Sequence, residues 1–170
     1  MIARPHTAEV TLPNSREVRV VRSFDAPRDL VYRAYTTPAL MQRWCLGPPG
    51  WTMPVCEMDV TVGGDYRWRW RADEDASEFG FHGTFLEVDA PERLRHTEFF
   101  DPGDTGEDMG EGHAVVTVSF AENDGVTTVT TDIEYQSPEA RDAAMATGMT
   151  DGMEMSYKNL DELLAAEVPA

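Results

Sequence analysis

The segment Arg43–Trp51 (RWCLGPPGW) constrains the fold of this chain more than any other. It separates a helical apolar pattern, which ends near Trp44, from a strand-like pattern, which opens at Thr52. Two prolines and two glycines between the tryptophans restrict the backbone to a tight loop. A short loop with a large apolar ring at each end is expected to close over apolar material. That material is either the protein's own core or a small molecule, and the sequence leaves both open.

Alternating apolar and polar residues predict a series of β-strands around this loop. The predicted strands cover residues 18–24, 55–62, 66–71, 79–88, 94–100, 113–120 and 126–135. Gly63-Gly64 and Asn123-Asp124-Gly125 supply hairpin turns. The acidic segment 101–112 lacks the spacing of a calcium loop and predicts a solvated hairpin loop. The pattern as a whole predicts a meandering antiparallel sheet.

Three segments carry helix-start signals, each a capping residue followed by a proline in the first turn. Asp25-Ala26-Pro27 and Thr37-Pro38 predict two short helices, and Ser137-Pro138 predicts one long helix that reaches close to the C-terminus. Residues 1–16 are predicted to form an irregular N-terminal arm, and residues 17–168 a single domain. This order of elements indicates an α+β fold in which a curved antiparallel sheet wraps around the C-terminal helix.

A formal net charge of −17 in 170 residues limits the partners of this protein. Such a field repels nucleic-acid backbones and anionic lipid surfaces, so we expect neither nucleic acid nor a membrane as a partner. The acidity serves either solubility or the docking of a basic partner. No apolar run resembles a signal peptide or a membrane helix, and Cys45 and Cys56 form no CxxC pair. A cytoplasmic protein with reduced thiols is therefore expected.

Several short motifs together resemble a known family. They are Phe24-Asp25-Ala26-Pro27, Arg43-Trp44 with Gly47-Pro48, Val62-Gly63-Gly64, Pro91-Glu92-Arg93-Leu94 and Gly148-Met149-Thr150-Asp151-Gly152. The chain resembles, over about residues 18–166, the activator-of-heat-shock-protein-90-ATPase-like branch of the START-like (SRPBCC) superfamily. The resemblance implies a helix-grip fold with a deep apolar cavity between the sheet and the C-terminal helix. Because the superfamily includes lipid carriers, hormone receptors and polyketide cyclases, it leaves the function open.

Two patterns indicate which residues would line such a cavity. Residues 66–71 alternate Tyr-Arg-Trp-Arg-Trp-Arg, which places the aromatic rings on one strand face and the arginines on the other. Met145, Met149 and Met153 form an adaptable stripe, and Gly148 and Gly152 beside it indicate a need for space. Each set has an alternative role as plain hydrophobic core. The expected ligand-binding residues are Trp44, Trp51, Met58, Tyr66, Trp68, Trp70, Phe81, Phe85, His96, Met145, Met149 and Met153.

These features favour a protein that binds a small hydrophobic or aromatic molecule. His96, Arg22 and indole N–H groups are the expected polar contacts of this molecule, and Glu98 is a further candidate for the lining of the cavity. One alternative is a polyketide-cyclase-like enzyme with His96 as its weak catalytic candidate. Another is an acidic protein-interaction module related to chaperone ATPase activators. The sequence has no HExxH, P-loop, GxGxxG or GxSxG motif and no Cys/His zinc cluster, so neither a cofactor nor a metal is expected. Enzymatic activity and a homodimer both stay open.

Overall fold

The computed structural model describes residues 6–103 and 113–167. Within these ranges the chain forms one eight-stranded antiparallel sheet and four helices. The strands are β1 (Glu9–Thr11), β2 (Glu17–Phe24), β3 (Trp51–Met58), β4 (Asp65–Ala72), β5 (Glu78–Asp89), β6 (Arg93–Asp101), β7 (Ala114–Asn123) and β8 (Val126–Glu134). The helices are α1 (Arg28–Thr36), α2 (Pro38–Trp44), α3 (Pro138–Ala146) and α4 (Met149–Glu167). None of the helices in the described part of the chain has the length and apolarity that crossing a bilayer requires.

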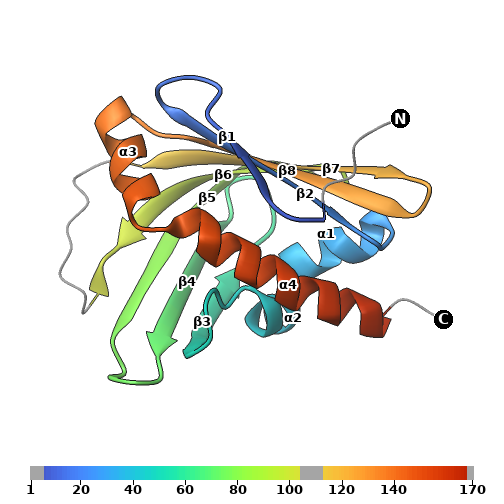
Figure 1. Ribbon diagram of the computed structural model, residues 1–170, viewed down its shortest axis with the longest axis horizontal. Helices are drawn as coiled ribbons and strands as arrows, with labels where there is room; N and C mark the ends of the chain where they lie inside the picture. The colour runs from blue at the N-terminus through green and yellow to red at the C-terminus, as the bar shows by residue number, and fades with distance from the viewer. Residues whose placement is uncertain (1–5, 104–112, 168–170) are drawn as a thin grey trace.

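The sheet curves around the last helix. Its strand order is β1-β2-β8-β7-β6-β5-β4-β3, so β3 to β8 form a meander and β2 pairs with β8. Figure 1 shows α4 crossing the concave side of this sheet, with α1 and α2 beside its later turns. A register shift between Phe85 and Glu87 places a bulge in the β5–β6 pair, and bulges bend and twist a sheet locally. The predicted α+β helix-grip architecture is confirmed.

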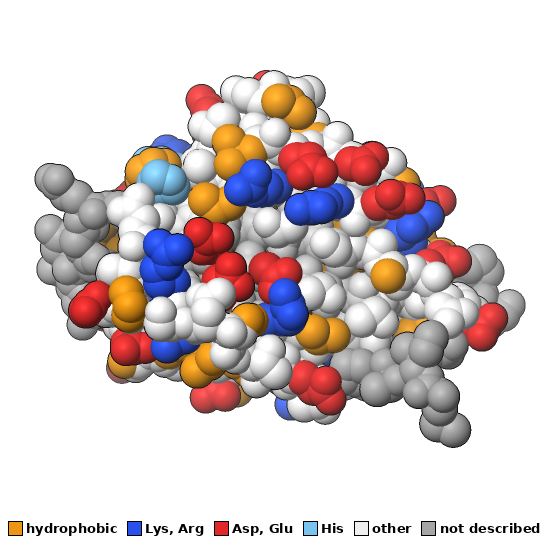
Figure 2. Space-filling view, turned by 90° about the horizontal axis from the view of Figure 1, so that it is seen from above, with side chains coloured by type: hydrophobic (Ala, Val, Ile, Leu, Met, Phe, Trp, Pro, Cys, Tyr) orange, Lys and Arg blue, Asp and Glu red, His pale blue; other side chains and the backbone are white. Residues whose placement is uncertain are grey.

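The convex face of the sheet is charged, and many of its charges are paired. Arg19 donates to Asp132 at 2.6 Å, and Arg69 donates to Glu78 at 3.2 Å and to Asp101 at 2.6 Å. Figure 2 shows basic and acidic side chains interspersed on the face seen from above. The arginines of the alternating 66–71 segment therefore lie on the side opposite to its aromatic rings.

Two predicted helix starts differ from the structure in detail. The prediction that Asp25 caps α1 is wrong, because the helix begins only at Arg28 and its N-cap residue is Pro27. The Asp25 carboxylate is instead hydrogen-bonded to His6 Nε2 at 2.8 Å. Thr37 is the N-cap residue of α2 but makes no capping bond with its side chain. Ser137 does cap α3, since its hydroxyl oxygen accepts a hydrogen bond from the Ala140 N–H at 3.1 Å.

The predicted single C-terminal helix is in fact two helices. Gly148 has φ = +79°, a left-handed conformation that ends α3 and redirects the chain into α4. Met145 therefore lies on α3, whereas Met149 and Met153 lie on α4. The methionine stripe spans a helix junction and is not one continuous helical face.

The sequence also misplaces two strands. Part of the N-terminal arm that is predicted to be irregular forms β1, which pairs with β2. The three residues of β1 are all exposed, so the sequence there shows no alternation of apolar and polar residues. β3 begins at Trp51 and ends at Met58, earlier than the predicted 55–62, because the Asp59 N–H already bonds across the following turn to Asp65 O at 2.9 Å. Most of the predicted acidic loop 101–112 and the first five residues of the arm lie outside the described residues, as do residues 168–170.

Hydrophobic core fills one half of the concave side, where β2, β7 and β8 face α1, α2 and the later turns of α4. We call this region the closed half; its buried side chains include Phe24, Val31, Ala34, Trp44, Phe120, Val129, Leu160 and Leu164. The Phe24 ring packs edge to face with Tyr157 of α4, and the Tyr35 ring of α1 with Phe120 of β7, at centroid distances of 5.6 and 5.2 Å. Full burial of each valine, leucine or phenylalanine among these side chains contributes about 1.5–3 kcal/mol.

A buried arginine fastens α4 to β2 in the closed half. Arg22 is 1% exposed and donates two hydrogen bonds to the Asp161 carboxylate, at 2.8 and 2.7 Å, and one to Glu154 at 3.2 Å. Burial alone would lower the pKa of Arg22, but the two carboxylates more than offset this effect and the net pKa is raised. Arg22, expected to contact a ligand, is thus engaged in holding the fold together.

Candidate functional site

The other half of the concave side, which we call the open half, is incompletely covered. It consists of β4, β5 and β6, Met58 at the end of β3, Tyr135 after β8, α3 and the first turns of α4. Its half-buried side chains are Met58, Trp68, Phe79, Phe81, Glu98, Phe100, Tyr135, Met145, Met149 and Met153. The strand residues among them alternate in phase with the buried Tyr66 and His96, so they point to the concave side. Their residual exposure means that α3 and α4 leave this surface partly accessible.

An aromatic wall forms the sheet side of the open half. Trp68 pairs with Phe81, and Phe81 pairs with Phe100, so three neighbouring strands place rings in one row. The Phe81 and Phe100 centroids lie 5.4 Å apart, and those of Tyr66 and Trp68 lie 4.3 Å apart. The indole N–H of Trp68 is buried and has no hydrogen-bond partner among the described residues. An unpaired buried donor costs about 1–3 kcal/mol, so this group is an available contact for a ligand.

Methionines of α3 and α4 form the helix side of the open half. The Tyr135 hydroxyl donates to Met149 Sδ at 3.4 Å, which ties the end of β8 to the start of α4. Met145, Met149 and Met153 are all half-buried against the core. Unbranched methionine side chains adapt to different neighbours, so this side of the open half can change shape at little cost.

The Gly-Pro loop closes on the protein itself. The Gly47 N–H donates to Ser156 Oγ of α4 at 2.9 Å, and the Trp70 indole N–H donates to Cys45 O at 2.6 Å. A Cβ on Gly152 would lie 4.0 Å from Pro48, so the space beside this glycine borders the loop. The loop therefore sets how closely α4 approaches the sheet, and it forms one edge of the open half.

His96 is a neutral, structural residue at the floor of the wall. Its Nδ1 lies 3.1 Å from Tyr66 Oη and 3.1 Å from Thr97 O, and Tyr66 Oη donates to the same carbonyl at 2.5 Å. We place the imidazole proton on Nδ1, because the carbonyl can only accept. Burial lowers the pKa of His96 to about 4, so the ring is uncharged at neutral pH. Tyr66 and His96 together satisfy the Thr97 carbonyl beside the β5–β6 bulge.

Glu98 is the most perturbed acid of the open half. It lies two residues after His96 on the same face of β6, opposite Ala114 of β7. The residue keeps some solvent exposure, yet the surrounding atoms desolvate its carboxyl, and burial raises its pKa to about 7. Its charge further raises the pKa values of Tyr66, Tyr135 and Cys45, for which burial is the larger cause. A carboxyl that titrates near neutral pH is typical of functional sites.

The structure separates the twelve predicted site residues into four groups. Met58, Trp68, Phe81, Met145, Met149 and Met153 come together around the open half. Tyr66, Trp70, Phe85 and His96 lie beneath them as buried support, and Trp44 belongs to the closed half, where its indole N–H donates to Ala34 O at 2.9 Å. Trp51 lies at the margin, its ring edge-on to Phe79 at a centroid distance of 5.3 Å.

Phe79, Phe100 and Tyr135 also lie in the open half but are absent from the predicted set, which names Glu98 only as a further candidate for the lining. Alternation from Leu94 and His96 does place Glu98 and Phe100 on the concave face. The desolvation of Glu98 cannot be predicted from the sequence, because the groups around it come from β4, the end of β8 and the loop after α2.

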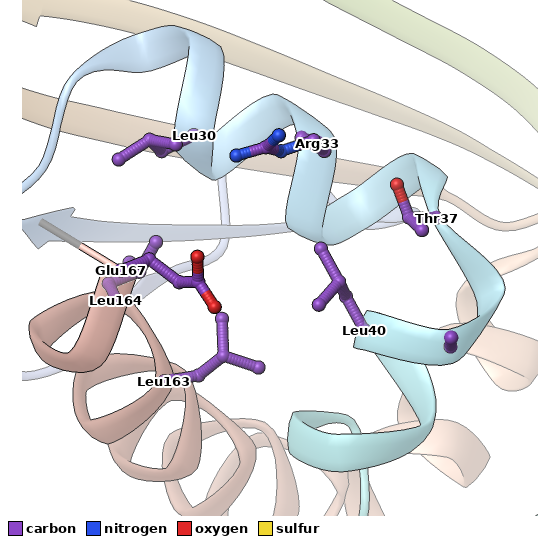
Figure 3. Close-up of a pocket in the computed structure, with 8 residues that line it drawn as sticks. Leu30, Arg33, Thr37, Leu40, Leu163, Leu164 and Glu167 are labelled. Atoms are coloured by element: carbon purple, nitrogen blue, oxygen red, sulfur yellow. The ribbon is translucent and has the colours of Figure 1, made fainter.

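Two surface pockets lie elsewhere. One, of about 290 Å³, lies between α1, α2 and the end of α4, and Figure 3 shows Leu30, Arg33 and Leu40 on one side of it and Leu163 and Glu167 on the other. A second, of about 530 Å³, contains Trp51 and the acidic turn 73–75. Neither is lined by a buried polar group without a partner, so we regard the open half as the stronger candidate. No cluster of potential metal ligands is found in the described ranges.

The fold places the protein in the helix-grip class of START-like proteins. The chain belongs to the family described as Activator of Hsp90 ATPase homolog 1-like protein, which matches residues 25–165. The resemblance seen in the sequence motifs is thereby confirmed. None of the curated proteins compared with the chain matches it.

Solved structures of similar proteins support this assignment. A protein from Rhodobacter sphaeroides is 28% identical, with a TM-score of 0.82 over 94% of this chain and 98% of its own. A protein from Chromobacterium violaceum is 29% identical, with a TM-score of 0.74 over 89% of this chain and 98% of its own. An AHSA1-like protein from Aeromonas hydrophila, 22% identical over 85% of this chain and 93% of its own, has a TM-score of 0.65 and shows the fold alone.

Proposed function

We propose that this protein binds a small hydrophobic or aromatic molecule in the open half, between the aromatic wall and the methionines of α3 and α4. One observation carries the proposal: the lining is apolar and half-exposed, and it contains a desolvated carboxyl at Glu98 and an indole N–H at Trp68, neither with a hydrogen-bond partner among the described residues. Apolar surfaces with a few convergent polar groups are typical of small-molecule sites.

The closed half provides the contrast that favours binding over simple core packing. There the chain buries its apolar residues almost completely, and its Trp44 indole and the terminal nitrogens of Arg22 are hydrogen-bonded, although Arg22 Nε is buried without a partner among the described residues. Leaving aromatic surface accessible and polar groups unpaired in the open half destabilises the unliganded protein. A ligand that covers the rings and bonds the polar groups would offset this destabilisation.

The acidic character of the chain supports a small molecule rather than a nucleic acid or a membrane as the partner. The net charge of −17 repels both polyanions. Proteins of this fold are commonly ligand-binding, which agrees with the proposal.

The test uses Nile red, a neutral dye whose emission rises in apolar surroundings, and compares two half-buried apolar positions. Met149→Gln changes the open half, whereas Leu40→Gln changes the surface pocket shown in Figure 3. We expect Met149→Gln to weaken dye binding about tenfold and Leu40→Gln to leave it unchanged. The opposite ranking would move the site to the surface pocket, and equal binding by both variants and the parent protein would refute an open-half site.

A further inference from the structure

Glu98 lacks a counter-ion within the described part of the chain. Arg22, which is buried, is already paired with Asp161 and Glu154. The arginines of β4 lie on the convex face, where Arg69 and Arg71 pair with Glu78. His96, on the same strand face as Glu98, is neutral because burial lowers its pKa to about 4. A positive charge for Glu98 must therefore come from outside the described residues.

The titratable groups that we place beside Glu98 carry no positive charge at neutral pH. They are Tyr66 on β4, Cys45 after α2, Tyr135 after β8 and His96 on β6 itself. Burial raises the pKa of Cys45 to about 12 and also raises the pKa values of both tyrosines, so all three stay protonated near neutral pH. Glu98 is then the one group among them that changes charge between about pH 6 and pH 8.

The aromatic wall adds a second preference for positive charge. Ring faces carry negative electrostatic potential and attract ammonium groups within about 6 Å. Trp68 lies with its centroid 5.8 Å from the His96 ring, and Phe100 follows Glu98 by two residues on the same strand face. The carboxyl thus lies on the strand face that carries these rings, an arrangement that suits an organic cation better than an anion.

We propose that the ligand of the open half is an organic amine with an apolar or aromatic body, whose ammonium group pairs with Glu98 while its body packs against Trp68, Phe81 and Met149. This inference rests on the proposed function and adds the chemical class of the ligand. The acidic field of the whole chain draws cations toward the protein and disfavours carboxylates or phosphates as ligands.

Binding of such a cation depends on pH in a defined direction. An ammonium group pairs only with ionised Glu98, so binding below about pH 7 releases a proton and is weakened. Affinity for the amine rises as the pH increases through this range, and levels off above it while the amine stays protonated. A neutral ligand of the same shape lacks this increase.

The experiment compares three indoles of similar size by isothermal titration calorimetry: cationic tryptamine, neutral tryptophol and anionic indoleacetate. The parent protein is expected to bind tryptamine about tenfold or more tightly than tryptophol at about pH 8, and indoleacetate least. Glu98→Gln keeps the shape of the side chain but removes its charge, so tryptamine should lose this advantage while tryptophol binds as before. Glu57→Gln, an exposed change on β3, controls for general attraction by the acidic surface and should alter nothing.

The outcomes separate the two levels of the proposal. If tryptophol binds the parent protein as tightly as tryptamine, or if Glu98→Gln keeps the preference for tryptamine, the amine assignment is wrong and the open-half site stands. If none of the three indoles binds and Nile red is not enriched either, the proposed function fails together with the inference. Urea unfolding of Glu98→Gln checks that the variant is folded before its binding is interpreted.

Discussion

The two ends of α4 face the same sheet, yet they are packed very differently. Leu160 and Leu164, in its later turns, are 0% and 3% exposed, whereas Met149 and Met153 at its start are only half-buried. The difference follows from what surrounds the helix, because α1 and α2 pack beside the later turns while α3 turns away at Gly148. One helix therefore acts as a core element at one end and as a partly exposed wall at the other.

Polar groups follow the same division. In the closed half the Trp44 indole donates to Ala34 O at 2.9 Å, and the Thr127 hydroxyl donates to Ala26 O at 2.7 Å. In the open half Trp68 Nε1 and the Glu98 carboxyl have no such partners among the described residues. Arg22 Nε, buried without a partner in the closed half, is an exception, so the open half is distinguished by the combination of unpaired polar groups with accessible apolar surface.

The largest expected effect is a difference in protein stability between substitutions at the two ends of α4. Leu160→Ala should lower the free energy of unfolding by about 2–5 kcal/mol, because it opens a cavity in a filled core. Met153→Ala, two helical turns earlier, should lower it by about 1 kcal/mol, because that side chain is already partly in water. Urea denaturation of both variants measures the difference, and equal losses would remove the distinction between the halves.

The next effect concerns the charge of Glu98 and depends on pH. Folding raises the Glu98 pKa from 4.5 to about 7, so the folded state binds this proton more tightly and loses stability as the pH rises through that range. At about 1.4 kcal/mol per pKa unit, Glu98→Gln should gain up to about 3 kcal/mol at about pH 8 and almost nothing at about pH 4.5. Denaturation curves at both pH values test this, and a gain that does not change with pH would show that Glu98 is not desolvated.

The stability of the protein depends on pH in the opposite direction through His96, which gives a second check on burial in the open half. Its pKa falls from 6.5 to about 4 on folding, so the folded state loses stability as the pH drops through that range. An NMR titration should find the ring neutral down to about pH 5. A His96 that titrates near its ordinary 6.5 would mean that the floor of the open half is hydrated.

The smallest effects concern the two glycines beside the methionines. Gly152→Ala should stabilise the protein by up to about 1 kcal/mol, since alanine favours a helix and its Cβ would meet only Pro48, at 4.0 Å. Gly148→Ala should destabilise it by about 1 kcal/mol, because φ = +79° disfavours any side chain. Thermal unfolding of the two variants measures whether each substitution raises or lowers the stability. A destabilising Gly152→Ala would mean that the Gly-Pro loop packs more tightly on α4 than the 4.0 Å distance to Pro48 indicates.

Much of the fold can be predicted because its signals are local. Apolar alternation places Tyr66, Trp68 and Trp70 on one strand face, and Ser137-Pro138 marks the start of α3. The site is less predictable because its properties arise between distant segments. Arg22 meets Asp161 across 139 residues, and this ion pair cannot be read from the sequence. The same reasoning applies to Glu98, whose position on the strand is readable but whose surroundings are not.

A methyl NMR spectrum of the nine methionines tests the division into halves most directly. On addition of tryptamine, the methyl signals of Met145, Met149 and Met153 should shift, whereas those of Met41 and Met53, each 4% exposed in the core, should stay in place. The exposed Met155 reports non-specific contact and should not move either. Shifts confined to Met41 and Met53, or spread evenly over all methionines, would contradict a ligand site in the open half.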